Sequence, residues 1–149
     1  MRQLPAFPIL LALIGASLTA CSSPPHDALA RLKKEPGTHA ILPASELLID
    51  GAQSFIIVCP YIPADTVSEL VGGESVKVPS DGYDSVLNSA VSLLADGSVW
   101  TQKYARDEVN LCPSGSDPSP TIRPASDLLT FEKHGRGWVL TEVTQERPE

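Results

Sequence analysis

The sequence lacks the excess of positive charge that a nucleic-acid-binding protein needs. Its 149 residues carry 11 Lys and Arg side chains against 18 Asp and Glu, a formal net charge of −7. A protein that binds nucleic acid must present a basic face to the phosphates. We therefore exclude nucleic acid as a partner, and the same acidic balance disfavours flat adhesion to an anionic lipid surface.

The short motifs that carry common catalytic and metal chemistry are missing as well. The chain has no Gly-x-Ser-x-Gly, no His-Glu-x-x-His and no phosphate-binding loop. Its three histidines, His26, His39 and His134, have neither helical nor Cys/His metal-ligand spacing. We expect no catalytic residue, no metal site and no cofactor.

No apolar run is long enough to span a bilayer, which takes about 20 residues. Residues 4–16 carry no charge, but Pro5 and Pro8 interrupt the start of this run. Arg2 precedes it, and small residues follow it. A basic start, a short apolar run and small residues before a cleavage point are typical of a secretory signal peptide.

The run ends in Leu18, Thr19, Ala20 and Cys21, which resembles the lipobox of bacterial lipoproteins. The resemblance implies a diacylglyceryl thioether on Cys21, removal of residues 1–20 and often acylation of the new amino terminus. The membrane is then a partner through this lipid, and the protein lies on the extracytoplasmic face. Because Ser22 carries no retention charge, a bacterium with two membranes would sort it to the outer one. The alternative is an ordinary signal peptide in which Cys21 is incidental.

Cleavage would leave 129 residues, enough for one domain with a hydrophobic core. Residues 28–34 match a short helix that is marginal alone, so residues 21–40 are interpreted as the lipidated cysteine and a flexible tether. Residues 41–149 are interpreted as a single extracytoplasmic domain. The mature chain has a net charge near −8, while residues 22–36 carry +1, so a slightly basic collar would lie beside the lipid.

Three cysteines are an odd number, which in an exported chain raises the question of a free thiol. The lipobox resemblance assigns Cys21 to the lipid and leaves Cys59 and Cys112. Outside the cytoplasm we expect these two to form a disulfide. A redox-active pair is the alternative, but the Cys-x-x-Cys spacing that lowers a thiol pKa is absent.

Hydrophobic periodicity predicts an α+β fold, with an antiparallel sheet of about five strands, one or two short helices and one disulfide. The clearest strand covers residues 54–59 and is apolar on both faces, which is typical of a strand covered on both sides. A helix is predicted over residues 64–71. Further strands and hairpins are predicted over residues 75–78, 83–95 with 98–105, 109–112, and 128–133 with 137–143. Residues 83–95 also match a helical stripe, so a helix there is the alternative.

Aromatic residues make up only 5% of the chain. Tyr61, Tyr83, Trp100 and Tyr104 are the candidate binding surface, although in so small a domain aromatics also belong to the core. The proline-rich loop 113–124 is the other candidate. We expect a lipid-anchored envelope lipoprotein that binds an envelope protein or wall component without catalysis. The alternative is a small envelope hydrolase acting on cell-wall polymer or peptide.

Overall fold

The computed structural model describes residues 28–146, and the expected signal peptide and Cys21 lie outside this part of the chain. Within it, no helix is long and apolar enough to cross a membrane. The elements in chain order are α1 (Ala28–Lys33), β1 (His39–Pro43), the 3-10 helix η1 (Ala44–Leu47), β2 (Ala52–Val58), α2 (Ala64–Leu70), β3 (Leu87–Leu94), β4 (Val99–Ala105), β5 (Val109–Asn110), β6 (Ile122–Pro124), β7 (Leu128–His134) and β8 (Gly137–Thr144).

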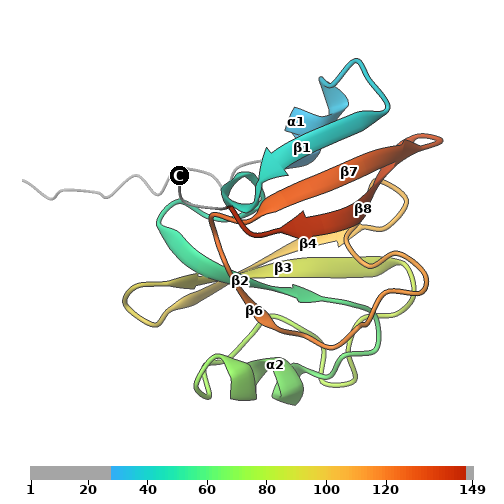
Figure 1. The fold of residues 1–149 in the computed structure, drawn as a ribbon. Coiled ribbons are helices and arrows are strands. Elements are labelled where there is room, and N and C mark those ends of the chain that lie inside the picture. Colours follow the sequence, from blue (N-terminus) through green and yellow to red (C-terminus); the bar gives the residue numbers. More distant parts are fainter. Residues whose placement is uncertain (1–27, 147–149) are drawn as a thin grey trace, which may run out of the picture.

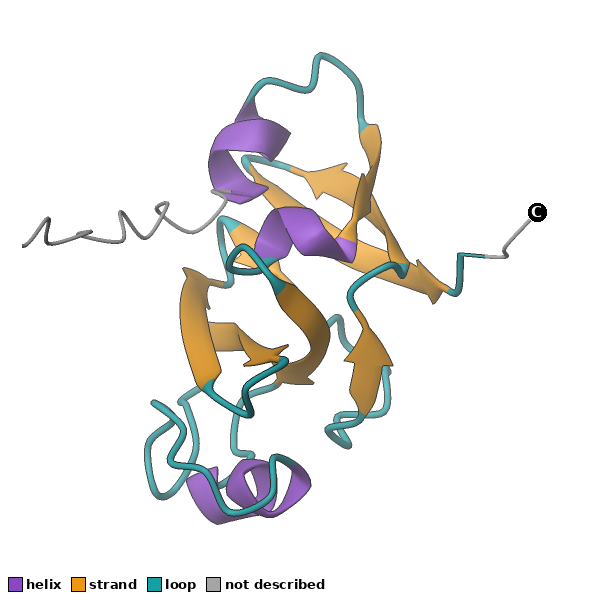
Figure 2. Cartoon of the chain, turned by 90° about the vertical axis from the view of Figure 1, so that its left-hand side faces the viewer, coloured by secondary structure: helices purple, strands orange, loops and turns teal. Residues whose placement is uncertain are grey.

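The strands form two four-stranded sheets. Sheet A has the order β1-β7-β8-β5 and sheet B the order β4-β3-β2-β6. Neighbouring strands pair antiparallel, except that β5 runs parallel to β8. Sheet A lies above sheet B in Figure 1, and α1 and α2 lie at opposite ends of the molecule in both views (Figures 1 and 2). The α+β class is confirmed, but the prediction of one sheet of about five strands is wrong. The short strands β1 and β6 were missed, because they lie in segments that look like tether and loop.

Strand β2 shows why the domain has three layers. Phe55 packs into a core cluster between the sheets, and Ile56, the next residue, packs into a second cluster on the opposite face of sheet B. Helix α2 covers that second cluster through Val67. Successive strand residues point to opposite faces, so an unbroken apolar run needs a layer on each side. The prediction of a central strand covered on both faces is confirmed.

Strands β3 and β4 form the predicted hairpin, with residues 87–93 of β3 paired to residues 105–99 of β4. Asp96 and Gly97 make the turn, and the Gly97 φ of 84° lies in the left-handed region that this turn requires. The Leu94 backbone N–H donates to the Ser98 carbonyl oxygen at 3.0 Å. The alternative of a helix over residues 83–95 is therefore wrong. Strand β3 begins only at Leu87, because residues 83–86 form part of the preceding loop.

The second predicted hairpin, β7–β8, is confirmed and forms the centre of sheet A. Trp138 at the start of β8 is 2% exposed, as expected for a core aromatic. Its neighbour Gly137 lies against the Asp107 carbonyl oxygen, where a Cβ atom would overlap it. The Trp138 N–H donates to the Glu108 carbonyl oxygen at 2.9 Å. A glycine is needed here because the 107–108 turn approaches β8 so closely.

The folded domain begins earlier than residue 41, which corrects the extent of the expected flexible tether. The helix over residues 28–34 forms as α1, but Ala28 and Leu32 are completely buried in the core between the sheets. Strand β1 then pairs with β7 from His39 onward. A six-residue helix is marginal in isolation, and burial of its apolar side chains against the sheets stabilises it.

The strand expected over residues 75–78 does not form. The alternation is nevertheless present, because Val76 and Val78 are buried in the cluster beneath sheet B. Lys77 between them is exposed, and its N–H contacts the Thr101 hydroxyl oxygen at 3.4 Å rather than a backbone ladder. Alternation of apolar and polar residues indicates which side chains are buried. Here the buried and exposed side chains alternate in a loop and not in a strand.

Candidate binding pocket beside the disulfide

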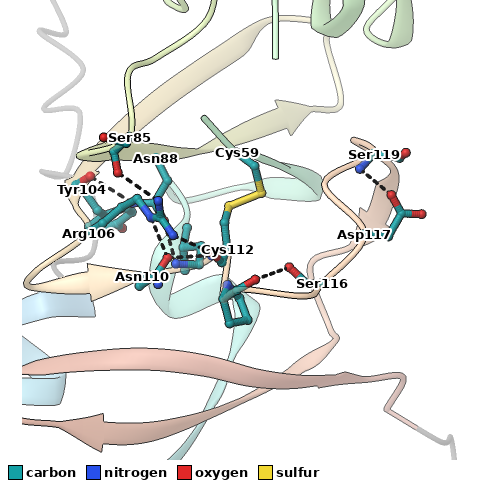
Figure 3. Close-up of a disulfide and its surroundings, with 12 residues drawn as sticks. Cys59, Ser85, Asn88, Tyr104, Arg106, Asn110, Cys112, Ser116, Asp117 and Ser119 are labelled. Carbon is teal, nitrogen blue, oxygen red and sulfur yellow. Dashed lines mark hydrogen bonds between the residues drawn. A yellow bond between two sulfur atoms is a disulfide. The ribbon is translucent and has the colours of Figure 1, made fainter. Parts of the chain in front are cut away.

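The predicted disulfide between Cys59 and Cys112 is present and joins the two sheets. Cys59 follows β2 of sheet B, and Cys112 follows β5 of sheet A, 53 residues further along the chain. Both cysteines are buried in the core between the sheets. Figure 3 shows the bridge with the loop 113–121 beginning directly after it. The bridge therefore determines where this loop leaves the sandwich.

Buried Asn88 on β3 holds the segment before the bridge in place. Its amide nitrogen donates to the carbonyl oxygens of Tyr104, at 2.9 Å, and Val109, at 3.0 Å. Its amide oxygen accepts from the Leu111 N–H at 2.6 Å. Asn88 is fully buried, and these bonds use both its donor protons and its acceptor. One side chain thus connects β3, β4 and the β5 segment in the domain interior.

Arg106 secures the same segment from its outer side (Figure 3). Its Nε donates to the Asn110 amide oxygen at 2.9 Å, and Nη2 donates to the Cys112 carbonyl oxygen at 2.8 Å. Nη1 donates to the Ser85 carbonyl oxygen at 2.9 Å. A hollow of about 450 Å³ beside Arg106 has this guanidinium as its only basic lining group. Three of the five guanidinium N–H groups already donate to the protein, so Arg106 is held in place at the edge of this hollow.

A smaller pocket, of about 190 Å³, lies where β8 of sheet A faces β6 of sheet B and the loop before it. We call it the seam pocket. Its apolar lining comes from both sheets and from the disulfide: Ile57, Cys59, Leu111, Leu140 and Val143. Its polar lining comes from the loop, β6 and β8: Ser116, Asp117, Ser119, Thr121, Arg123, Thr141 and Glu142. An apolar floor with a few polar groups around it is typical of a ligand-binding site.

The loop at the rim of the seam pocket is held by its own hydrogen bonds. The Ser116 hydroxyl donates to the Pro113 carbonyl oxygen at 2.7 Å, and the Ser119 N–H donates to Asp117 Oδ1 at 2.9 Å (Figure 3). The Ser119 N–H and then its hydroxyl hold the pKa of the Asp117 carboxyl below its usual value. Asp117 is therefore a carboxylate at neutral pH.

Arg123, the basic residue of the seam pocket, is engaged by a buried acid. Its Nε donates to Asp127 Oδ2 at 2.6 Å, and the Asp127 side chain is fully buried. Removing one partner of such a pair leaves an uncompensated buried charge and costs about 3–5 kcal/mol. Arg123 is thus paired with Asp127 through its Nε, and the pair carries no net charge.

The four candidate aromatic residues do not form one binding surface. Tyr83 and Tyr104 are core residues, 3% and 6% exposed, and their hydroxyls donate to the carbonyl oxygens of Lys77 and Leu47. Tyr61 and Trp100 are exposed, and the Lys77 ammonium lies 5.5 Å from the Trp100 ring centroid. None of the four lines the seam pocket. Only the loop 113–124, the second sequence candidate, contributes to it, together with a floor that sequence patterns did not identify.

Burial of Tyr83 leads to a prediction about alkaline stability. Burial raises the pKa of its phenol above the ordinary value of about 10. The protonated phenol therefore stabilises the fold below pH ~10, and this contribution is lost as the pH rises from there through the folded-state pKa. At neutral pH, Tyr83→Phe should cost about 1 kcal/mol, because the bond to the Lys77 carbonyl is removed. Above pH ~10 the variant should lose less stability than the wild type, as measured by denaturant unfolding across pH. A constant difference at every pH would contradict this.

The described part of the chain contains few side chains placed to act in catalysis or to bind a metal ion. Its two histidines, His39 and His134, lie on sheet A, with their Nε2 atoms 3.5 and 3.7 Å from the Glu132 carboxylate. Neither lines the seam pocket, so Ser116 and Ser119 have no histidine beside them there. Residues 28–146 contain no group of three or more His, Cys, Asp or Glu side chains placed to hold a metal ion.

Comparison of the chain with protein-family models, with curated proteins and with solved structures finds no match. The function is therefore argued from the residues and the site geometry. The described residues form a small two-sheet domain with a disulfide between the sheets and a partly apolar pocket at their seam.

Proposed function

We propose that this chain is a lipid-anchored envelope protein whose domain binds a partner without catalysing a reaction. The observation that carries the proposal is the lipobox-like run Leu18 to Cys21, a few residues before α1, which begins at Ala28. A disulfide between Cys59 and Cys112 supports export, because such bonds persist in oxidising compartments. The proposed lipid anchor, an oxidising compartment and a fold with a disulfide are thus consistent with one another.

The position of α1 in the chain limits how far the domain can stand from the lipid. Six residues, 22–27, separate Cys21 from α1, so the backbone between Cys21 and Ala28 spans about 25 Å at most. Exposed Arg31, Lys33 and Lys34, in and just after α1, are the described basic residues closest to the anchor along the chain. The domain is therefore held near the headgroups, and not on the longer tether expected from sequence.

Binding is favoured over hydrolysis by the composition of the seam pocket. Its floor is apolar, its rim is held by hydrogen bonds, and the serines that line it lack a histidine to activate them. A general base must lie within hydrogen-bond reach of the proton it removes. The pocket suits recognition of a group on an envelope protein or wall component.

The test of the anchor is the substitution Cys21→Ala. The variant should lose the acyl mass and leave the membrane fraction, or remain uncut with residues 1–20 attached, because the thiol that accepts the lipid is gone. Membrane fractionation and intact mass spectrometry measure both effects. Ser22→Ala is the matched control, and it should leave mass and partition unaltered apart from the substituted atom. A Cys21→Ala protein with wild-type processing and membrane partition would disprove lipidation.

A further inference from the structure

The size of the seam pocket limits what it can hold. Small-molecule and cofactor sites occupy roughly 300–1,000 Å³. The seam pocket has about 190 Å³ and opens to solvent between β8 and the loop 113–121. A single side chain projecting from a partner chain fits this space, whereas a nucleotide or an oligosaccharide does not.

The lining determines the chemistry of that side chain. Ile57, Leu111 and Leu140 form an apolar floor, which favours an aliphatic stem. Asp117 on the loop and Glu142 on β8 are both exposed, and both line the pocket. The pair of Arg123 with Asp127 carries no net charge, so the two lining acids give the pocket and this pair a net charge of −2.

We propose that the seam pocket binds a lysine side chain of a partner polypeptide, with its methylene stem on the floor and its ammonium group between Asp117 and Glu142. This rests on the proposed binding function and specifies its ligand. Lysine fits better than arginine because two separate carboxylates suit a compact ammonium with three donors. The planar guanidinium instead favours both oxygens of a single carboxylate.

The experiment is a titration of the mature protein, in its acylated form in detergent micelles, followed by amide chemical shifts in NMR. The probes are acetyl-Gly-Lys-Gly-amide and the same peptide with norleucine, arginine or glutamate in the centre. The lysine peptide should bind with a Kd of about 1 mM, since one side chain supplies all the contact. Shifts should concentrate at Ile57, Leu140 and Thr141. The norleucine peptide should bind about fivefold more weakly, and the glutamate peptide more weakly still.

Charge variants test the rim directly. Asp117→Asn keeps the oxygen that accepts from Ser119, and Glu142→Gln keeps the side-chain length. Together they should weaken lysine binding about fivefold, to the norleucine level, and leave norleucine binding unchanged. Glu69→Gln on α2, an exposed acid outside the pocket lining, is the control and should change neither. Equal melting temperatures confirm that the fold is retained.

Equal affinities for the lysine and norleucine peptides, or shifts away from the pocket, would overturn the proposal, as would tighter binding of arginine or glutamate. Membrane partition of the same preparation is measured in parallel. Protein that partitions to membranes but does not prefer lysine would overturn the pocket assignment alone. Unanchored protein that does prefer lysine would overturn the anchor alone.

Discussion

Replacing both Cys59 and Cys112 by serine should lower the free energy of unfolding by about 4 kcal/mol. The bridge closes a loop of 53 residues, and the chain-entropy estimate for a loop of this length is of that size. In a domain whose net stability is about 5–15 kcal/mol, this is a large fraction. Thermal unfolding followed by circular dichroism should show the melting temperature about 15 °C lower than in the wild type.

Reduction provides the control for this experiment. Wild-type protein unfolded in excess dithiothreitol should approach the stability of the double variant, and the variant itself should not respond to the reductant. Two titratable thiols in untreated native protein, or a wild-type melting temperature unaffected by reduction, would contradict the bridge. The NMR probes at Leu111 should also shift in the variant, because this residue precedes Cys112 in the pocket floor.

Asn88→Ala should cost about 4 kcal/mol, nearly as much as loss of the disulfide. The substitution removes one hydrogen-bond partner from each of three backbone groups, at Tyr104, Val109 and Leu111. Each buried polar group left without its partner costs about 1–3 kcal/mol. Denaturant unfolding measures the loss, and hydrogen exchange should show the Leu111 amide losing protection.

Ser92→Ala is the matched control for Asn88→Ala. Ser92 is also fully buried on β3, but its hydroxyl oxygen accepts only one backbone bond, from the Ile49 N–H at 3.3 Å. The control should cost about 1 kcal/mol. If Asn88→Ala costs no more than Ser92→Ala, the network around β5 does not stabilise the domain as described.

Elements with strong local patterns were predictable. Strand β2 has an unbroken apolar run, α2 follows Pro63, and the β3–β4 turn is formed by Asp96 and Gly97. The β7–β8 hairpin likewise has alternating apolar residues on both strands. In each case the residues that determine the element are close together in the chain, so local sequence is sufficient.

Elements that depend on distant partners were not predictable. A short helix over residues 28–34 was predicted, but its place in the domain was not, because it depends on burial of Ala28 and Leu32 between the sheets. Strand β6 is only three residues long within a proline-rich stretch, and it exists because β2 offers a free edge. The second sheet was not predicted because the short strands β1 and β6 are stabilised by pairing with strands that lie far away in the chain.

The candidate site was also predictable only in part. The disulfide followed from the cysteine count and the resemblance, and the loop 113–124 was singled out by its prolines. Tyr104 was misplaced because an aromatic residue in a strand can point to either face of the sheet. Tyr83 was misplaced because it lies in the loop before β3, where no strand alternation indicates burial. The role of Asn88 had one sequence signal, a polar residue within an apolar strand pattern, but its partners lie 16 to 23 residues away.

The amino-acid sequence by itself was sufficient to predict the hairpins, the central strand, the pairing of the two remaining cysteines and a lipid anchor. These depend on local spacing and on residue counts. The tertiary structure alone decided that two sheets enclose the core, that α1 belongs to the domain, and that Ile57, Leu140 and Glu142 meet the loop 113–121 around one pocket. The reason is that burial and pocket formation depend on which distant segments stack together, and short-range periodicity carries no information about that stacking.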